Sequence, residues 1–161
     1  MGSYADDALF MSRNNIEYVE LISDDGKSKV MVIPAWQGRV MTTSAAGDEG
    51  DSYGWINYSF IKKRQIDLQF NPVGGEERFW LGPEGGVFSL YFRQGEKQIY
   101  KNWKVPPVLD IEAFKIQSQS KNCICLTKEG CLTNACGTTF YLNIKRTISL
   151  LDINEFAASF N

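Results

Sequence analysis

Residues 138–151 alternate apolar and polar side chains with a period of two, which is the pattern of a β-strand with one buried face. Arg146 falls on the apolar face, so we expect it either at the rim of a sheet or paired with a buried acid. The apolar face carries Phe140, Leu142, Ile144, Ile148 and Leu150, and the polar face carries Thr139, Tyr141, Asn143, Lys145, Thr147 and Ser149. This regularity points to a sheet protein.

Shorter runs predict six further strands, most of them separated by glycine, proline or polar turn residues. They cover residues 16–22, 29–33, 39–44, 87–92, 112–119 and 122–133. Ser23 to Gly26 read as a hairpin turn, and Asp6 and Asp7 ahead of an apolar run indicate a short N-terminal helix. The sequence therefore predicts one all-β, mainly antiparallel domain over residues 1–161, a β-sandwich with a short helix at its start.

The composition of the chain excludes several classes of function. Of the 161 residues, 43% are hydrophobic and 22% are charged, as in ordinary globular domains. A net charge of −2 provides no basic surface, so we expect neither nucleic acid nor a membrane as partner. The chain has no histidine, which excludes a Ser-His-Asp triad and histidine-ligated metals. We predict no cofactor, no metal and no catalytic residue. Residues 1–15 do not resemble a signal peptide. The sequence therefore leaves the compartment open: we expect a cytoplasmic protein, or a periplasmic or secreted one if a leader was removed.

Four cysteines, Cys123, Cys125, Cys131 and Cys136, lie within fourteen residues. Their spacing does not match the paired C-x2-C pattern of zinc sites. They form either a thiolate metal site or a disulfide pair, or they are small apolar side chains that fill a sheet face. The spacing favours the last interpretation.

Two segments, 34–41 and 74–86, combine glycines, aromatic rings and charges. Trp80 and Phe79 offer flat apolar faces, and Arg78, Glu77 and Glu84 offer charge-assisted hydrogen bonds. A sugar needs this mixture, an aromatic plate for its C–H face and polar groups for its hydroxyls. Further residues that fit the same surface are Trp36, Gln37, Arg39, Trp55 and Asn57. The alternative is a rigid turn in which Arg78 pairs with Glu77 or Glu84 and the tryptophans lie in the core.

The stretches IPAWQGRVMTTSAAGDEGDSYGWINYSFI, FNPVGGEERFWLGPEGGVFSLYF and LTNACGTTFYLNIKRTISLL resemble a family of bacterial proteins related to galactose mutarotase-like (aldose 1-epimerase-like) β-supersandwich proteins. The likeness spans most of residues 6–151. It implies that the chain holds the N-terminal part of a larger supersandwich, and that Arg78, Glu84 and Arg39 line a sugar site. Mutarotases use a glutamate base from the later part of the fold and a histidine acid, so no catalytic residue is transferred.

We therefore expect a carbohydrate-binding protein whose ligand contacts Trp36, Gln37, Arg39, Glu77, Arg78, Trp80 and Glu84. Aldose epimerase-like or glycoside-processing activity is expected only of a longer chain. The main alternative is a non-catalytic module that forms homo-oligomers through exposed sheet edges. A third hypothesis, glycoside hydrolysis, needs two carboxylates among Glu76, Glu77 and Glu84 facing one groove.

Overall fold

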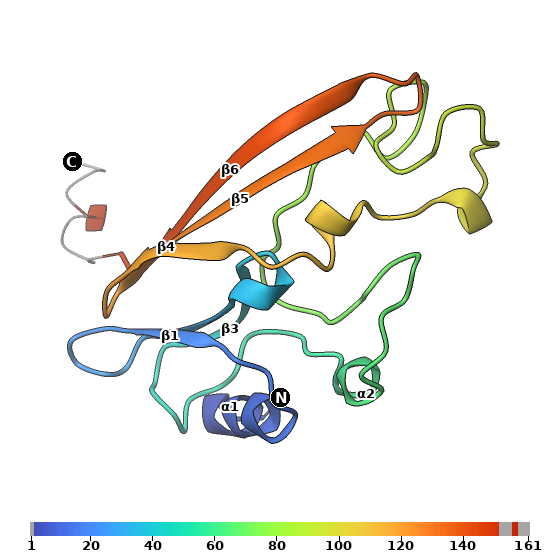
Figure 1. Ribbon diagram of the computed structural model, residues 1–161. Helices are drawn as coiled ribbons and strands as arrows, with labels where there is room; N and C mark the ends of the chain where they lie inside the picture. The colour runs from blue at the N-terminus through green and yellow to red at the C-terminus, as the bar shows by residue number, and fades with distance from the viewer. Residues whose placement is uncertain (1, 152–155, 158–161) are drawn as a thin grey trace.

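In the computed structural model, which describes residues 2–151 and 156–157, the chain forms two three-stranded antiparallel sheets (Figure 1). The first contains β1 (Val19–Ile22), β2 (Lys29–Ile33) and β3 (Arg39–Ser44), and the second contains β4 (Lys115–Gln119), β5 (Cys123–Thr133) and β6 (Thr139–Ser149). In both sheets the strands lie in chain order, as a meander. The prediction of a mainly antiparallel β fold is confirmed.

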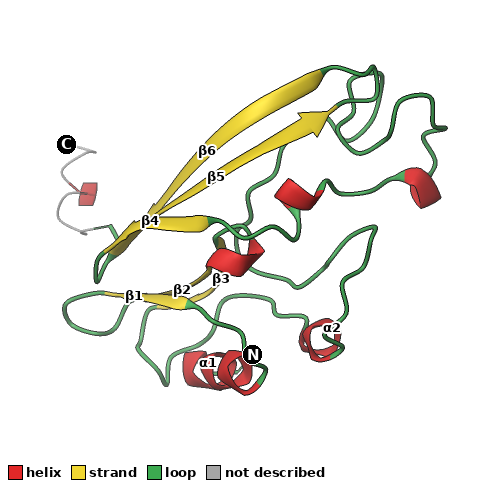
Figure 2. Cartoon of the chain, viewed as in Figure 1, coloured by secondary structure: helices red, strands yellow, loops and turns green. Residues whose placement is uncertain are grey.

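Short helices flank the first sheet and interrupt the loops (Figure 2). They are α1 (Tyr4–Arg13), α2 (Tyr58–Lys62) and three single 3-10 turns, η1 (Pro34–Trp36), η2 (Tyr100–Asn102) and η3 (Pro107–Leu109). The predicted N-terminal helix is thus confirmed. It begins with a capping box, in which the Ser3 hydroxyl accepts from the Asp6 N–H while the Asp6 carboxylate accepts from the Ser3 N–H. No helix within the described residues has the length and hydropathy to cross a bilayer.

Strand β2 is buried along its whole length because both faces of the first sheet are covered. Val30 and Val32 pack in a core shared with the second sheet, and Met31 and Ile33 pack in a smaller core against α1. The helix lies below this sheet in Figure 1. One apolar run of five residues therefore supplies two hydrophobic cores.

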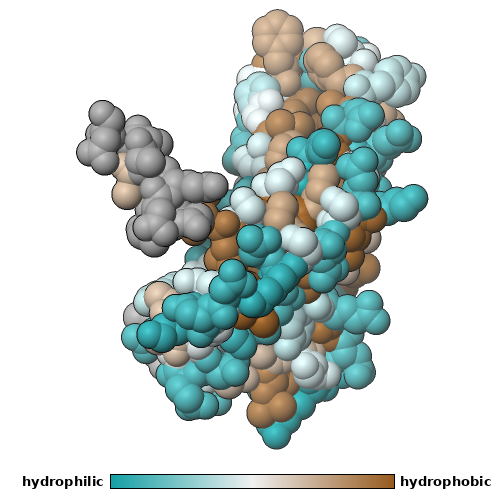
Figure 3. All heavy atoms as spheres, turned by 90° about the vertical axis from the view of Figure 1, so that its left-hand side faces the viewer, coloured by the Kyte–Doolittle hydropathy of each residue, from teal (hydrophilic) through white to brown (hydrophobic). Residues whose placement is uncertain are grey.

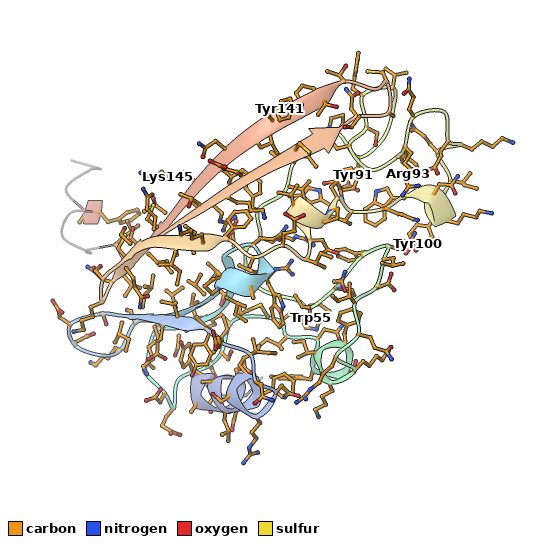
Figure 4. All side chains as sticks on the ribbon, in the orientation of Figure 1. Trp55, Tyr91, Arg93, Tyr100, Tyr141 and Lys145 are labelled. Atoms are coloured by element: carbon orange, nitrogen blue, oxygen red, sulfur yellow. The ribbon has the colours of Figure 1, made fainter. Side chains whose placement is uncertain are left out.

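The second sheet buries the face that the alternation predicts. Ile124 and Leu126 of β5 and Ile144 of β6 join the shared core, while Tyr141 and Lys145 point to the open face (Figure 4). Arg146 lies on the core side with its side chain 10% exposed and pairs with an acid, Glu77. That acid is half exposed, so Arg146 forms an ion pair as expected, but its partner is not the buried acid that we predicted.

The predicted strand over residues 87–92 is wrong. Its backbone N–H groups donate to carbonyl oxygens of separate loop residues: Ser89 donates to Gly86, and Leu90 donates to Pro83. No ladder forms, and Val87 and Phe88 remain exposed. Residues 63–99 contain no helix or strand, and this irregular stretch supplies much of the wall opposite the second sheet.

All four cysteines are free thiols. Cys125 is buried on β5 and its Sγ lies 3.3 Å from Oε1 of Gln117, whereas Cys131 and Cys136 are exposed. Within residues 2–151 and 156–157, no group of three or more acidic or cysteine side chains is arranged to hold a metal ion. Viewed from the side of the β4–β5 turn, the surface mixes hydrophilic and hydrophobic residues (Figure 3).

Candidate functional site

The residues expected to bind a sugar do not share one surface. Gln37 and Arg39 are buried. Gln37 follows the 3-10 turn η1 in a left-handed conformation (φ 67°), and Arg39 begins β3. Arg39 Nη1 donates to the carbonyl oxygen of Gly74 at 2.7 Å, and Nη2 donates to Gln37 Oε1 at 3.3 Å. Burial and the nearby charge of Arg78 lower the pKa of Arg39 to about 10. In this structure the pair braces the junction between β3 and the Gly74 segment.

Arg78 has a different acid partner from those that the sequence suggests. Its Nη2 donates to the carbonyl oxygen of Leu109 at 2.6 Å and lies 3.5 Å from Oδ1 of Asp110. Its guanidinium carbon lies 4.1 Å from the centre of the Trp80 ring, in cation–π contact. Burial lowers the pKa of Arg78, against the opposing charge of Asp110. The side chain thus lies between an aromatic ring and a buried acid.

The hydrolysis hypothesis requires two carboxylates among Glu76, Glu77 and Glu84 that face one groove. Each of these three side chains has a separate partner. Glu76 accepts a hydrogen bond from the hydroxyl of Thr43 at 3.0 Å, and Glu77 pairs with Arg146. Glu84 Oε1 accepts from the indole N–H of Trp80 at 2.9 Å. The prediction that Arg78 pairs with Glu77 or Glu84 is therefore corrected.

Trp80 belongs to an aromatic stack, which we define as Trp80, Tyr91, Trp103 and Tyr100. The rings of Tyr91 and Trp103 are nearly parallel, with centres 5.6 Å apart and planes 6° apart. Trp80 lies 5.1 Å from Tyr91 on a tilt, and Tyr100 stacks on Trp103 at 6.3 Å. The Trp80 ring therefore packs against Arg78 and Tyr91, and the exposed member of the stack is Tyr100.

Trp36 lies elsewhere, in the wall of a pocket of about 340 Å³ that we call the Trp36 pocket. The pocket is formed where η1, α2, the segment after α2 and the residues after η3 meet. Its polar groups are Asn14, Arg64, Gln65, Asn71 and Asp110. Its apolar wall consists of Ile16, Ala35, Trp36, Phe60, Ile61, Ile66, Val73 and Ile111. A mostly apolar cavity with a few convergent polar groups is the usual form of a small-molecule site.

Asp110 is the buried polar group of this pocket. Its Oδ2 accepts from the backbone N–H of Asn71 at 3.0 Å and from Asn71 Nδ2 at 2.7 Å. Burial raises the pKa of Asp110, although the hydrogen bonds from Asn71 and the charge of Arg78 oppose the rise. Among the described residues, the one polar contact of Oδ1 is the long 3.5 Å contact with Arg78, so the carboxyl group retains capacity to accept from a ligand hydroxyl.

The pocket brings in residues that the sequence did not single out. Asp110 and Asn71 are 39 residues apart and meet only through the fold. Pro106 and Pro107 mark a break in the chain just before Asp110, but they do not indicate its role. Of the seven expected ligand residues, Trp36 lines the pocket and Arg78 contacts Asp110 from behind it.

Residues 2–161 match a protein family described as a family of unknown function (DUF6786), so the chain belongs to that family. No curated protein and no solved structure matches the chain. The expected relation to galactose mutarotase-like proteins stays a prediction.

Proposed function

We propose that this protein binds carbohydrate and that the Trp36 pocket takes one neutral sugar residue. The observation that carries the proposal is the composition of the pocket, an indole and a phenyl ring together with a buried carboxyl group and rim amides. The motif resemblance to galactose mutarotase-like proteins supports the same ligand class. We also propose that the two sheets belong to a supersandwich of that type.

In the proposed complex, the sugar places a C–H face against Trp36 or Phe60. The carboxyl group of Asp110 accepts from one hydroxyl, and the exposed side chains of Arg64 and Gln65 bond to others at the rim. Water competes for each of these bonds, so a single sugar binds weakly, with a Kd on the order of 0.1–10 mM.

The test is a titration of the chain with a panel of neutral monosaccharides and short oligosaccharides, followed by NMR. We expect saturable shifts in the wild type that are lost in Trp36→Ala. Trp55→Ala is the matched control, since Trp55 is 64% exposed and does not line the pocket. Because Trp36 also packs against the smaller core, Gln65→Ala gives a second variant at an exposed rim position. Unchanged binding in both pocket variants, or no binding by the folded wild type across the panel, would sink the proposal.

A second candidate function is homo-oligomerisation through β6. This strand has eleven residues and a neighbour on one side only within the described sheet, which leaves a long unpaired edge. Phe140 and Tyr141 on it are 45% and 88% exposed. A second copy that pairs along this edge would cover both rings.

Light scattering on the purified chain tests this second candidate. A species of twice the chain mass is expected, and Tyr141→Lys should return it to the monomer because a lysine blocks pairing at a sheet edge. Tyr100→Lys is the control, since Tyr100 is 78% exposed but far from β6 in sequence and on η2. A monomer at all concentrations, or a dimer unaffected by Tyr141→Lys, would remove this function.

A further inference from the structure

A second cavity, which we call the Lys104 pocket, lies beside the aromatic stack, and η2 contributes Asn102 to its lining. Its volume is about 530 Å³, and it shares no lining residue with the Trp36 pocket. Residues 90–94 and 102–107 form one side, and the end of β5 with residues 131–134 forms the other. In Figure 4, Tyr91 and Arg93 lie together in this region, with Tyr100 on the neighbouring turn.

The charged side chains that line the Lys104 pocket are all positive. Arg93 and Lys104 line it, and no acidic side chain does. Neither cation forms an ion pair with an acidic residue in the described part of the chain. The remaining polar groups are amides and a hydroxyl, from Gln94, Asn102, Thr133 and Asn134. Two cations without an acidic partner among the described residues, beside neutral polar groups, are suited to a carboxylate or phosphate group.

The base of the pocket is apolar and held in place. Tyr91 and Leu132 are almost fully buried there, and Tyr91 is fixed by its stacking on Trp103 and by its hydroxyl, which donates to the carbonyl oxygen of Leu81 at 2.6 Å. The backbone N–H of Lys104 donates to the carbonyl oxygen of Tyr91 at 2.9 Å, which fixes the main chain of Lys104 beside the base. The apolar base is therefore preformed, and this part of the site loses little conformational freedom on binding.

We infer that the Lys104 pocket binds a small organic anion, with its carboxylate or phosphate on Arg93 and Lys104 and its carbon skeleton against Leu90 and Leu132. This site is additional to the proposed sugar site. Attraction to the cations supplies the selectivity for charge, and the apolar base supplies the selectivity against inorganic ions.

The experiment is an NMR titration of the whole chain with four probes: glucuronate, glucose 6-phosphate, inorganic phosphate and glucose. We expect saturable shifts at the pocket with one or both organic anions, and a Kd at least tenfold higher for inorganic phosphate and for glucose. The comparison of glucuronate with glucose 6-phosphate separates a carboxylate ligand from a phosphate ligand. Equal affinity for glucose and the anions, or no saturable shift with either organic anion, would overturn the inference.

Charge variants locate the site. R93Q and K104Q should each raise the Kd for the organic anion about tenfold or more, and both lie at exposed positions where folding is not at risk. K145Q is the matched control, because Lys145 is exposed on the open face of β6 and lines neither pocket. Unchanged affinity in R93Q and K104Q refutes the assignment. Trp36→Ala should leave anion binding intact, so the sugar proposal and this one fail independently.

Discussion

Arg146, near the end of β6, forms an ion pair with Glu77, which lies 69 residues earlier in the irregular segment. The same guanidinium donates to the carbonyl oxygen of Gly38 at 3.3 Å, in the turn that precedes β3. One side chain therefore joins the second sheet to the first and to the segment between them. The cation is mostly covered, whereas the acid is half exposed.

We predict that Glu77→Ala lowers the free energy of unfolding by about 1–2 kcal/mol, because it leaves a mostly covered cation with a carbonyl oxygen as partner. Because the Glu77 carboxylate is half exposed, we expect a smaller loss of stability than for a fully buried ion pair. Urea denaturation measures the change, with Glu96→Ala as control, since Glu96 is exposed and forms no ion pair with described residues. Equal stability of the two variants would contradict the prediction.

Gly38→Ala should destabilise the protein more than Gly26→Ala. Both glycines have a positive φ, 62° and 73°, so each substitution carries the backbone strain of about 1 kcal/mol. A Cβ on Gly38 would lie 2.3 Å from Cδ1 of the buried Leu126, while a Cβ on Gly26 would meet nothing within 4 Å. We expect an additional loss of about 1–3 kcal/mol for Gly38→Ala from this clash, measured as a lower urea midpoint.

Tyr58 should make stability fall at alkaline pH. Burial and the hydrogen bond that its phenol donates to Asp7 raise the pKa of Tyr58 from 10.0 to about 12. The unfolded chain therefore loses this proton first, and the stabilisation is complete below pH 10 and lost as the pH rises to about 12. Tyr58→Phe should show a smaller fall over that window in unfolding experiments. Parallel pH curves for the two proteins would show that Tyr58 does not titrate in this way.

Cys136 should be alkylated faster than the other thiols. A hydrogen bond from Thr138 lowers the pKa of Cys136, and the thiolate is the reactive form. Buried Cys125 should react slowest. Thr138→Val should slow the alkylation of Cys136. The alkylation rate of exposed Cys131 should not change and serves as an internal reference. Peptide mass spectrometry after timed iodoacetamide treatment gives each rate, and equal rates at Cys131 and Cys136 would disprove the role of Thr138.

The sequence predicts those elements whose residues repeat with a local period. Strands 29–33 and 39–44 have the predicted bounds, and the three C-terminal strands agree within a few residues at each end. The run 87–92 has the composition of a strand but no partner strand, because its N–H groups bond to separate parts of the loops. Hydrogen-bond partners of this kind depend on the whole fold, which composition does not encode.

The candidate site was harder to predict for the same reason. Arg78 has two acids close in sequence, Glu77 and Glu84, yet its acid partner is Asp110, which is 32 residues away. The Trp36 pocket is assembled from short pieces of several loops, so its residues have no common spacing. Trp36 is conspicuous in the sequence because it is a tryptophan, whereas Asp110, a single aspartate after a proline turn, carries no such signal.

The aromatic stack provides an intrinsic optical probe. Indole and phenol rings held in a fixed, nearly parallel arrangement, as in Tyr91 and Trp103, produce near-ultraviolet circular dichroism that disappears when tertiary packing loosens. Tyr91 is also part of the base of the Lys104 pocket. Ligand binding in that pocket can therefore be followed in unlabelled protein by the near-ultraviolet circular dichroism of the stack. The far-ultraviolet signal reports the secondary structure of the sheets.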